Sequence, residues 1–128
     1  MSTQYIFFYG TLMCPEVYSA VAGQSLVSEP AVLKGYQIYS LKDRVYPGIK
    51  TDLNAEVTGV ISKVDSNTLD KLDWFEGSEY ERKYVKLRVD VKNQFEAWVY
   101  VLKETNHYLI DNEGWSYESF LKNNIKYY

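Results

Sequence analysis

The first apolar segment of the chain is an aromatic run that ends at a glycine. Residues 5–9, Tyr-Ile-Phe-Phe-Tyr, contain no charged or amide residue before Gly10. A continuous apolar run of this length is typical of a strand that is buried on both faces. We therefore predict that residues 5–9 form a central strand.

Later segments alternate between apolar and polar residues. Residues 84–91 and 95–101 each carry apolar side chains at every second position, and the turn-like residues 92–94 separate them. A period of two is typical of strands that are buried on one face, so we predict a hairpin here. Residues 32–41 and 57–64 are also predicted to form strands, although Gly59 interrupts the second and its alternation is poor.

Helix signals stand between and after these strands. Residues 65–67 offer N-cap side chains before a helix with Leu69, Leu72 and Phe75, and Gly77 is placed to end it. Ser116 can cap a short helix near the end of the chain, and Pro15 suits the first turn of another. Short strands with few helices predict an α+β domain built on a barrel or strongly curved sheet.

Length and composition favour one folded domain spanning residues 1–128. The 128 residues are 46% hydrophobic and 16% aromatic, which is enough for one core. A net charge of −3 argues against a nucleic-acid partner. No segment approaches the roughly 20 apolar residues of a membrane span, and the start of the chain resembles no signal peptide. We therefore expect a cytoplasmic protein without a membrane partner.

The cysteine and histidine content leaves little room for metal or thiol chemistry. Cys14 and His107 are each the single residue of their type, so an internal disulfide is excluded and a zinc site lacks ligands. Cys14 as a nucleophile is the weaker alternative, because a catalytic thiol needs a nearby base and His107 is far away in sequence. We expect no metal.

The turn formed by Tyr9, Gly10, Thr11 and Leu12 is the first candidate binding site. It lies where the aromatic strand ends, and successive backbone N–H groups in such a turn can bind an anion. Gly10 would let a ligand approach the backbone, and the Thr11 hydroxyl adds a donor. The alternative is a tight turn that binds nothing.

Glu76 is the candidate for acid–base chemistry. At about 100° per residue it falls between Leu69 and Leu72 on the helical wheel, which places its carboxyl on the face expected to be buried. Burial and the negative end of the helix should raise its pKa, which suits a group that takes up and returns a proton. The alternative is a solvated Glu76, or one paired with Arg82 or Lys83. The other nearby acids, Asp73, Glu79 and Glu81, are expected to be solvated.

Four motifs in order resemble the γ-glutamylcyclotransferase-like family, in particular its AIG2-like branch. They are Tyr9-Gly10-Thr11-Leu12; Tyr46-Pro47-Gly48-Ile49; residues 72–77 (Leu-Asp-Trp-Phe-Glu-Gly) followed by Tyr80-Glu81-Arg82 and Val85; and residues 97–101 (Ala-Trp-Val-Tyr-Val). The resemblance spans nearly the whole chain. It implies a small mixed β-barrel with flanking short helices, a cavity at one end, and no cofactor.

The same resemblance implies a reaction. The loop of Tyr9, Gly10, Thr11 and Leu12 would hold the α-carboxylate or γ-glutamyl part of a small γ-glutamyl amine or amino acid. Glu76 would act as general acid/base while the substrate cyclises, releasing 5-oxoproline and an amine or amino acid.

The resemblance also selects residues around this site. Tyr46 and Pro47 would shape the rim of the cavity. Tyr100 and Arg82 are further candidates for substrate contacts, and their alternatives are a tyrosine bound to water or backbone and a surface ion pair. Substrate selectivity would then depend on connections expected to be flexible, at residues 45–52 and 105–114.

Two functions from other classes remain open at this point. The same fold could serve as a non-catalytic binding module for a small metabolite, because fold alone does not determine function. An interaction protein would need a large exposed apolar patch. The leaving amine and the oligomeric state do not follow from the sequence.

Overall fold

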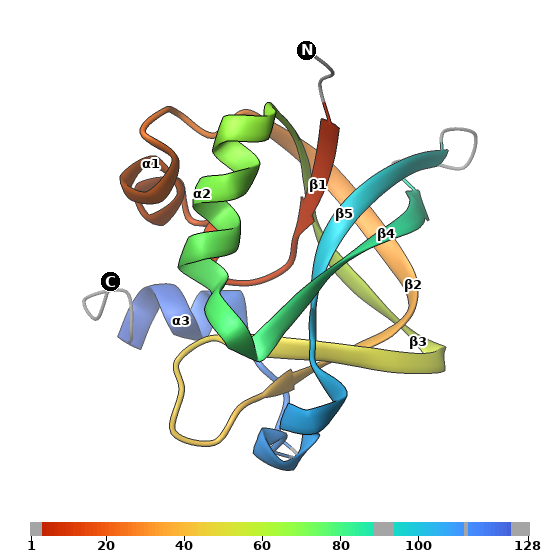
Figure 1. The fold of residues 1–128 in the computed structure, drawn as a ribbon. Coiled ribbons are helices and arrows are strands. Elements are labelled where there is room, and N and C mark those ends of the chain that lie inside the picture. Colours follow the sequence, from red (N-terminus) through yellow and green to blue (C-terminus); the bar gives the residue numbers. More distant parts are fainter. Residues whose placement is uncertain (1–3, 89–93, 112, 124–128) are drawn as a thin grey trace.

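The computed structural model describes residues 4–88, 94–111 and 113–123, and within them five strands close into a barrel (Figure 1). The strands are β1 (Gln4–Phe8), β2 (Ser28–Ser40), β3 (Pro47–Val64), β4 (Tyr80–Arg88) and β5 (Gln94–Leu102). Their order around the barrel is β1-β3-β2-β4-β5. β1 pairs antiparallel with β3 and parallel with β5, and the other neighbours are antiparallel. The predicted mixed barrel is confirmed.

Short helices flank the barrel. They are α1 (Pro15–Ala22), α2 (Ser66–Glu76) and α3 (Tyr117–Asn123), with 3₁₀ segments η1 (Thr11–Met13), η2 (Gly77–Glu79) and η3 (Glu104–Leu109). The Asp65 side chain accepts a 2.7 Å hydrogen bond from the Thr68 N–H, and Gly77 ends α2 with a φ of 73°. The helix signals in the sequence were therefore correct. None of the helices in the described ranges is long and apolar enough to cross a membrane.

β1 is buried on both faces, as its apolar run predicts. Phe7 and Tyr9 belong to the cluster inside the barrel, together with Val99. Ile6 and Phe8 belong to a second cluster, which the helices cover. The strand therefore separates two cores, and the residues that follow it lie at the boundary between barrel and helices.

β3 is longer than the sequence pattern indicated. It begins at Pro47 instead of residue 57, and residues 47–51 pair with residues 36–40 of β2. The connection expected to be flexible at residues 45–52 is thus mostly strand. Exposed polar residues such as Thr51 and Glu56 give this half no apolar pattern, and pairing with β2 holds it in place.

The glycine that interrupts the pattern of β3 has a steric cause. A Cβ on Gly59 would lie 2.2 Å from the carbonyl oxygen of Phe8, on the neighbouring strand β1. The β4–β5 hairpin was predicted correctly, but β4 begins at Tyr80 instead of residue 84. Most of the predicted turn, and the end of the first strand, lie at residues 89–93, outside the described residues.

Candidate functional site

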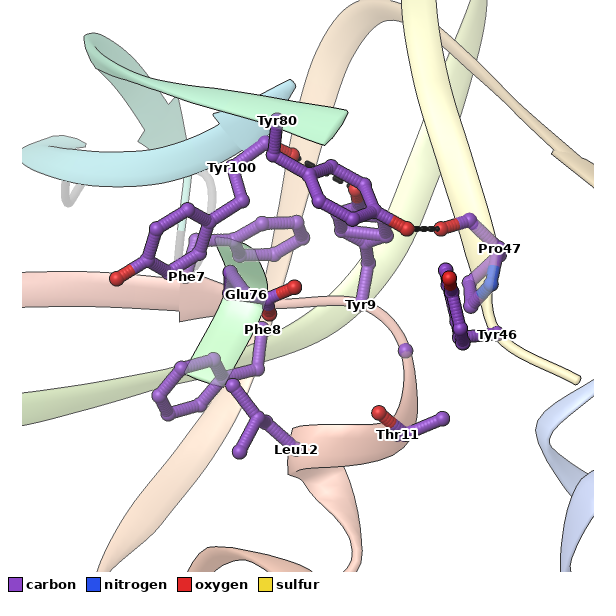
Figure 2. Close-up of a pocket in the computed structure, with 11 residues that line it drawn as sticks. Phe7, Phe8, Tyr9, Thr11, Leu12, Tyr46, Pro47, Glu76, Tyr80 and Tyr100 are labelled. Atoms are coloured by element: carbon purple, nitrogen blue, oxygen red, sulfur yellow. Dashed lines mark hydrogen bonds between the residues drawn. The ribbon is translucent and has the colours of Figure 1, made fainter. Parts of the chain in front are cut away.

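A pocket opens at one end of the barrel, beside the last turn of α2 (Figure 2). The end of β1, the starts of β3 and β4, the last residue of α2 and a residue near the end of β5 meet here. Its free space is about 310 Å³ including the open mouth. The lining residues are Phe7, Phe8, Tyr9, Gly10, Thr11, Leu12, Tyr46, Pro47, Glu76, Tyr80 and Tyr100.

The turn after β1 lines this pocket, and it carries donors that have no acceptor among the described residues. The backbone N–H groups of Thr11 and Leu12, at the start of η1, donate no hydrogen bond to any acceptor in the described part of the chain. The Thr11 hydroxyl likewise has no hydrogen bond among those residues. The turn is further constrained because a Cβ on Gly10 would lie 2.9 Å from the ring of Pro47. The lack of a side chain at Gly10 therefore brings the two parts of the rim together.

Glu76 is the ionisable carboxyl among the lining residues. It is half-buried, and Figure 2 shows its carboxyl pointing into the pocket between Phe8 and Tyr9. Within the described ranges no group donates a hydrogen bond to it. Burial, and then the charge of Asp73, raises the pKa of Glu76 to about 8. The raised pKa expected from the helical wheel is confirmed.

Pairing of Glu76 with Arg82 or Lys83, the alternative, does not occur. Arg82 Nε lies 2.9 Å from Asp73 Oδ1, and Lys83 Nζ lies 3.3 Å from Glu81 Oε1. Arg82 also stacks over the ring of Trp98, 4.3 Å from its centroid. Arg82, a candidate for substrate contacts, is therefore not among the residues that line the pocket.

The hydroxyls of the four pocket tyrosines donate hydrogen bonds to carbonyl or carboxylate oxygens of the protein. Tyr9 donates to the Tyr100 carbonyl (2.7 Å) and Tyr80 to the Pro47 carbonyl (2.5 Å), as Figure 2 shows. Tyr46 donates to Glu79 (2.6 Å), and Tyr100 donates to Asp73 (2.7 Å). Burial raises the pKa of all four. They therefore remain neutral, and their rings serve as walls.

Tyr100 lines the pocket, but from the side of the barrel that faces the helices. It belongs to the cluster beneath the helices, whereas its neighbours Val99 and Val101 point into the barrel. Burial, followed by the hydrogen bond to Asp73, raises the pKa of Tyr100, and the charge of Glu76 adds to this effect. Tyr100 thus connects the wall of the pocket to Asp73 on α2.

Several pocket residues were not predicted from the sequence, and the prediction for two acids was wrong. Phe7 and Phe8 were assigned to the core alone, and Tyr80 was noted only as part of a motif. Asp73 and Glu79 were predicted to be solvated, but both have protein partners. Asp73 accepts bonds from Tyr100 and Arg82. Glu79 accepts bonds from Tyr46 and Arg44. The signal for Tyr80 was its position shortly after Gly77, where the chain leaves α2 and enters β4.

The thiol of Cys14 does not have the environment of a nucleophile. It is buried, and its Sγ lies 2.9 Å from Glu16 Oε2. Burial, and then this bond to Glu16, raises the pKa of Cys14. Among the described residues, no three His, Cys, Asp or Glu side chains gather as a metal ion would require.

Comparison with known proteins gives the family and the fold of this chain. The sequence model of the family described as γ-glutamyl cyclotransferase, AIG2-like, matches residues 6–117. The chain is 34% identical to Protein AIG2 B of Arabidopsis thaliana over 77% of this chain, and it spans only 61% of that relative. A solution structure of another Arabidopsis thaliana protein superposes with a TM-score of 0.78 at 27% identity, covering 95% of this chain and 74% of that one.

A solved structure named gamma-glutamyl cyclotransferase shares the fold at lower identity. Its TM-score is 0.72 at 18% identity, and the match covers 80% of this chain and 68% of that one. At this identity the likeness concerns the fold alone. Because the family model covers most of the chain, this protein belongs to the γ-glutamyl cyclotransferase, AIG2-like, family.

Proposed function

We propose that this protein is a γ-glutamyl cyclotransferase-type enzyme that releases 5-oxoproline from a small γ-glutamyl amine or amino acid. The observation that carries the proposal is the arrangement of Glu76 in the pocket. Its carboxyl has a raised pKa and no hydrogen-bond donor among the described residues, and it shares the pocket with the free N–H groups of Thr11 and Leu12. Membership of the family supports the same activity.

The N–H groups of Thr11 and Leu12 would hold the α-carboxylate of the substrate. Orientation is the main requirement, because the α-amine must reach the γ-carbonyl of its own glutamyl group. The aromatic rings of Tyr9, Tyr46 and Tyr80 would form the walls that keep the glutamyl chain folded. These rings exclude water, which strengthens every electrostatic interaction inside the pocket.

The proton steps would pass through Glu76. Its carboxylate takes a proton from the α-ammonium, and the free amine attacks the γ-carbonyl carbon to form the C–N bond of the ring. The tetrahedral intermediate then breaks the C–N bond to the leaving amine. Two protons leave the attacking nitrogen and two reach the leaving nitrogen, so Glu76 takes up and returns a proton twice. No water molecule is consumed.

A pKa of about 8 suits this relay, because it lies close to the pH at which the group must both accept and donate. The α-ammonium of the substrate carries a positive charge. Beside Glu76 it would favour the carboxylate form and lower the pKa of Glu76 on binding. The substrate would therefore help to create the base that it needs.

The test is incubation of the pure protein with a panel of γ-glutamyl amino acids and γ-glutamylamines, with 5-oxoproline detected by mass spectrometry. We expect product from at least one class and a loss of about 10²- to 10⁴-fold in turnover for Glu76→Gln, the usual contribution of a general acid/base. Glu81→Gln is the matched control, because Glu81 is paired with Lys83 outside the pocket. It should retain wild-type turnover.

Two outcomes would contradict the proposal. One is the absence of 5-oxoproline with every member of the panel, and the other is full activity of Glu76→Gln. If the wild-type protein binds a panel member saturably without forming product, a non-catalytic binding module would be the better description. Binding is measured for this purpose by titration calorimetry with the same compounds.

A further inference from the structure

Glu79 lies where three segments of the chain meet. Its Oε2 lies 2.7 Å from Arg44 Nη2 and 2.9 Å from Arg44 Nε, and its Oε1 accepts a 2.6 Å hydrogen bond from the Tyr46 hydroxyl. Its carbonyl oxygen accepts bonds from the Lys103 N–H (3.0 Å) and from Asn106 Nδ2 (3.1 Å). Glu79 therefore joins the β2–β3 loop, η2, and the junction of β5 with η3.

The β2–β3 loop, residues 41–46, passes beside the end of α2 before β3 begins (Figure 1). Its backbone is held by bonds from the Lys42 N–H to the Leu109 carbonyl (2.7 Å) and from Trp115 Nε1 to the Val45 carbonyl (2.9 Å). Neither bond fixes the side chain of Tyr46. The Tyr46 hydroxyl is instead held by Glu79.

Tyr46 is a wall of the pocket, and its position depends on this contact. Its ring packs against the ring of Tyr80, with centroids 6.3 Å apart, and both rings line the pocket. Tyr80 directly follows Glu79 in the chain, and Glu76 comes three residues before Glu79. A displacement of Glu79 would therefore move two walls and the end of the helix that carries the acid.

The carboxylate form of Glu79 is required by the geometry of its partners. Each of its two oxygens faces a donor, Arg44 on one side and Tyr46 on the other. A glutamine has one acceptor oxygen and no charge, so with that oxygen on Arg44 its NH₂ group would have to donate to the Tyr46 hydroxyl, and both charge-assisted hydrogen bonds would become neutral ones. Charge-assisted hydrogen bonds of this kind are stronger than neutral ones.

We propose that Glu79 is a positioning residue that fixes Tyr46 as a wall of the pocket through the paired contacts to Arg44 and Tyr46. Its relevance to substrate binding rests on the proposed function. A wall that contacts the substrate equally in the ground state and the transition state changes KM and leaves kcat in place.

Amide hydrogen exchange tests the position of the wall without any need for activity. In Glu79→Gln we expect exchange at residues 41–49 to become about tenfold faster, the effect of losing one strong hydrogen bond. Amides of β1 and β5 should keep their wild-type rates. Tyr46→Phe, which removes only the hydroxyl, should accelerate exchange in the same segment, and Glu81→Gln is the control that should leave it unchanged.

Kinetics supply the second measurement. If the wild-type protein forms 5-oxoproline, Glu79→Gln and Tyr46→Phe should each raise KM by about tenfold with kcat nearly unchanged. The double variant should be no worse than either single variant, because both substitutions remove the same charge-assisted hydrogen bond, from the Tyr46 hydroxyl to the Glu79 carboxylate. Unchanged exchange at residues 41–49, or an increase spread over the whole barrel, would overturn the proposal. Failure of the wild-type reaction would contradict the proposed function alone, since the exchange result still decides the role of Glu79.

Discussion

Two glutamates only three residues apart, Glu76 and Glu79, have opposite environments. Glu76 faces the pocket without a hydrogen-bond donor among the described residues, and its pKa is raised to about 8. Burial alone would also raise the pKa of Glu79, but its bonds to Arg44 and Tyr46 outweigh burial and place that pKa below its usual range. The difference comes from partners as well as from burial, because Glu79 accepts bonds from Arg44 and Tyr46, whereas no described group donates to Glu76.

The two environments suit a glutamate side chain to two different roles. A carboxyl without partners can bind and release a proton near neutral pH, which is useful for chemistry and costly for stability. A carboxyl with two donors stays charged and holds segments together. The turn from α2 through η2 to β4 places Glu76 in the pocket and Glu79 behind one of its walls, bonded to Tyr46.

The largest effect that we expect is the pH dependence of stability in Glu76→Gln. Between pH 4.5 and about 8 the folded protein keeps the proton on Glu76 while the unfolded chain loses it, so the wild type loses stability as pH rises. The slope is at most about 1.4 kcal/mol per pH unit, reduced by solvent that reaches the carboxyl through the pocket mouth. Glutamine does not titrate, so the variant should lack this slope and be the more stable protein at pH 8.

Urea unfolding at several pH values measures this difference. The wild type and Glu76→Gln should converge below pH 4.5, as the acid becomes protonated in both states, and should separate steadily up to pH 8. Glu81→Gln removes an exposed acid and should follow the wild type. Parallel curves for wild type and Glu76→Gln would mean that Glu76 is solvated like an ordinary surface carboxyl.

A smaller effect of opposite sign is expected for Glu79→Gln. Because the pKa of Glu79 is lowered, its contribution to stability is present at neutral pH and is lost as pH falls through the folded pKa. The variant should be about 2 kcal/mol less stable than the wild type at pH 7, the usual effect of a lost hydrogen bond to a charged group. Glu79→Gln and the wild type should agree in strong acid, where Glu79 is protonated in both the folded and the unfolded state. Equal stability at pH 7 would remove the contrast between the two glutamates.

The local signals around Glu76 were readable in the sequence. Asp65 as N-cap, Gly77 as helix end and the wheel position of Glu76 all depend on residues within one helix, so the raised pKa of the acid could be predicted. The contrast with Glu79 could not be predicted, because Arg44 lies 35 residues away and the two meet only through the tertiary fold.

The other pocket residues also divide into those that local sequence could predict and those that depend on the tertiary fold. The turn at Tyr9 to Leu12 follows directly from the end of an apolar run, and its motif pointed to a site. Phe7, Phe8 and Tyr80 line the pocket because the barrel closes around them, and their own pattern is that of ordinary core residues. The first half of β3 was missed for a related reason, since its polar residues are held by pairing with β2.

The smallest effect that we expect concerns the contribution of Asp73 to the environment of Glu76. Asp73 lies one turn before Glu76 on α2, and its charge is the second cause of the raised pKa, after burial. Its Oδ1 accepts bonds from Tyr100 (2.7 Å) and Arg82 (2.9 Å), so the Arg82 charge partly offsets it. Asp73→Asn should lower the pKa of Glu76, and Arg82→Gln should raise it. Both shifts should be smaller than the one that burial causes.

The opposite directions of these two variants make the test specific. The acidic limb of the kcat/KM profile, which reports the base in the free enzyme, should move to lower pH in Asp73→Asn and to higher pH in Arg82→Gln. Carbon-13 NMR titration of the Glu76 carboxyl gives the same answer without turnover. A shift in the same direction for both variants would indicate a general disturbance of the pocket. No shift in either would mean that burial alone sets the pKa of Glu76, and the contrast with Glu79 would then rest entirely on the presence or absence of hydrogen-bond donors.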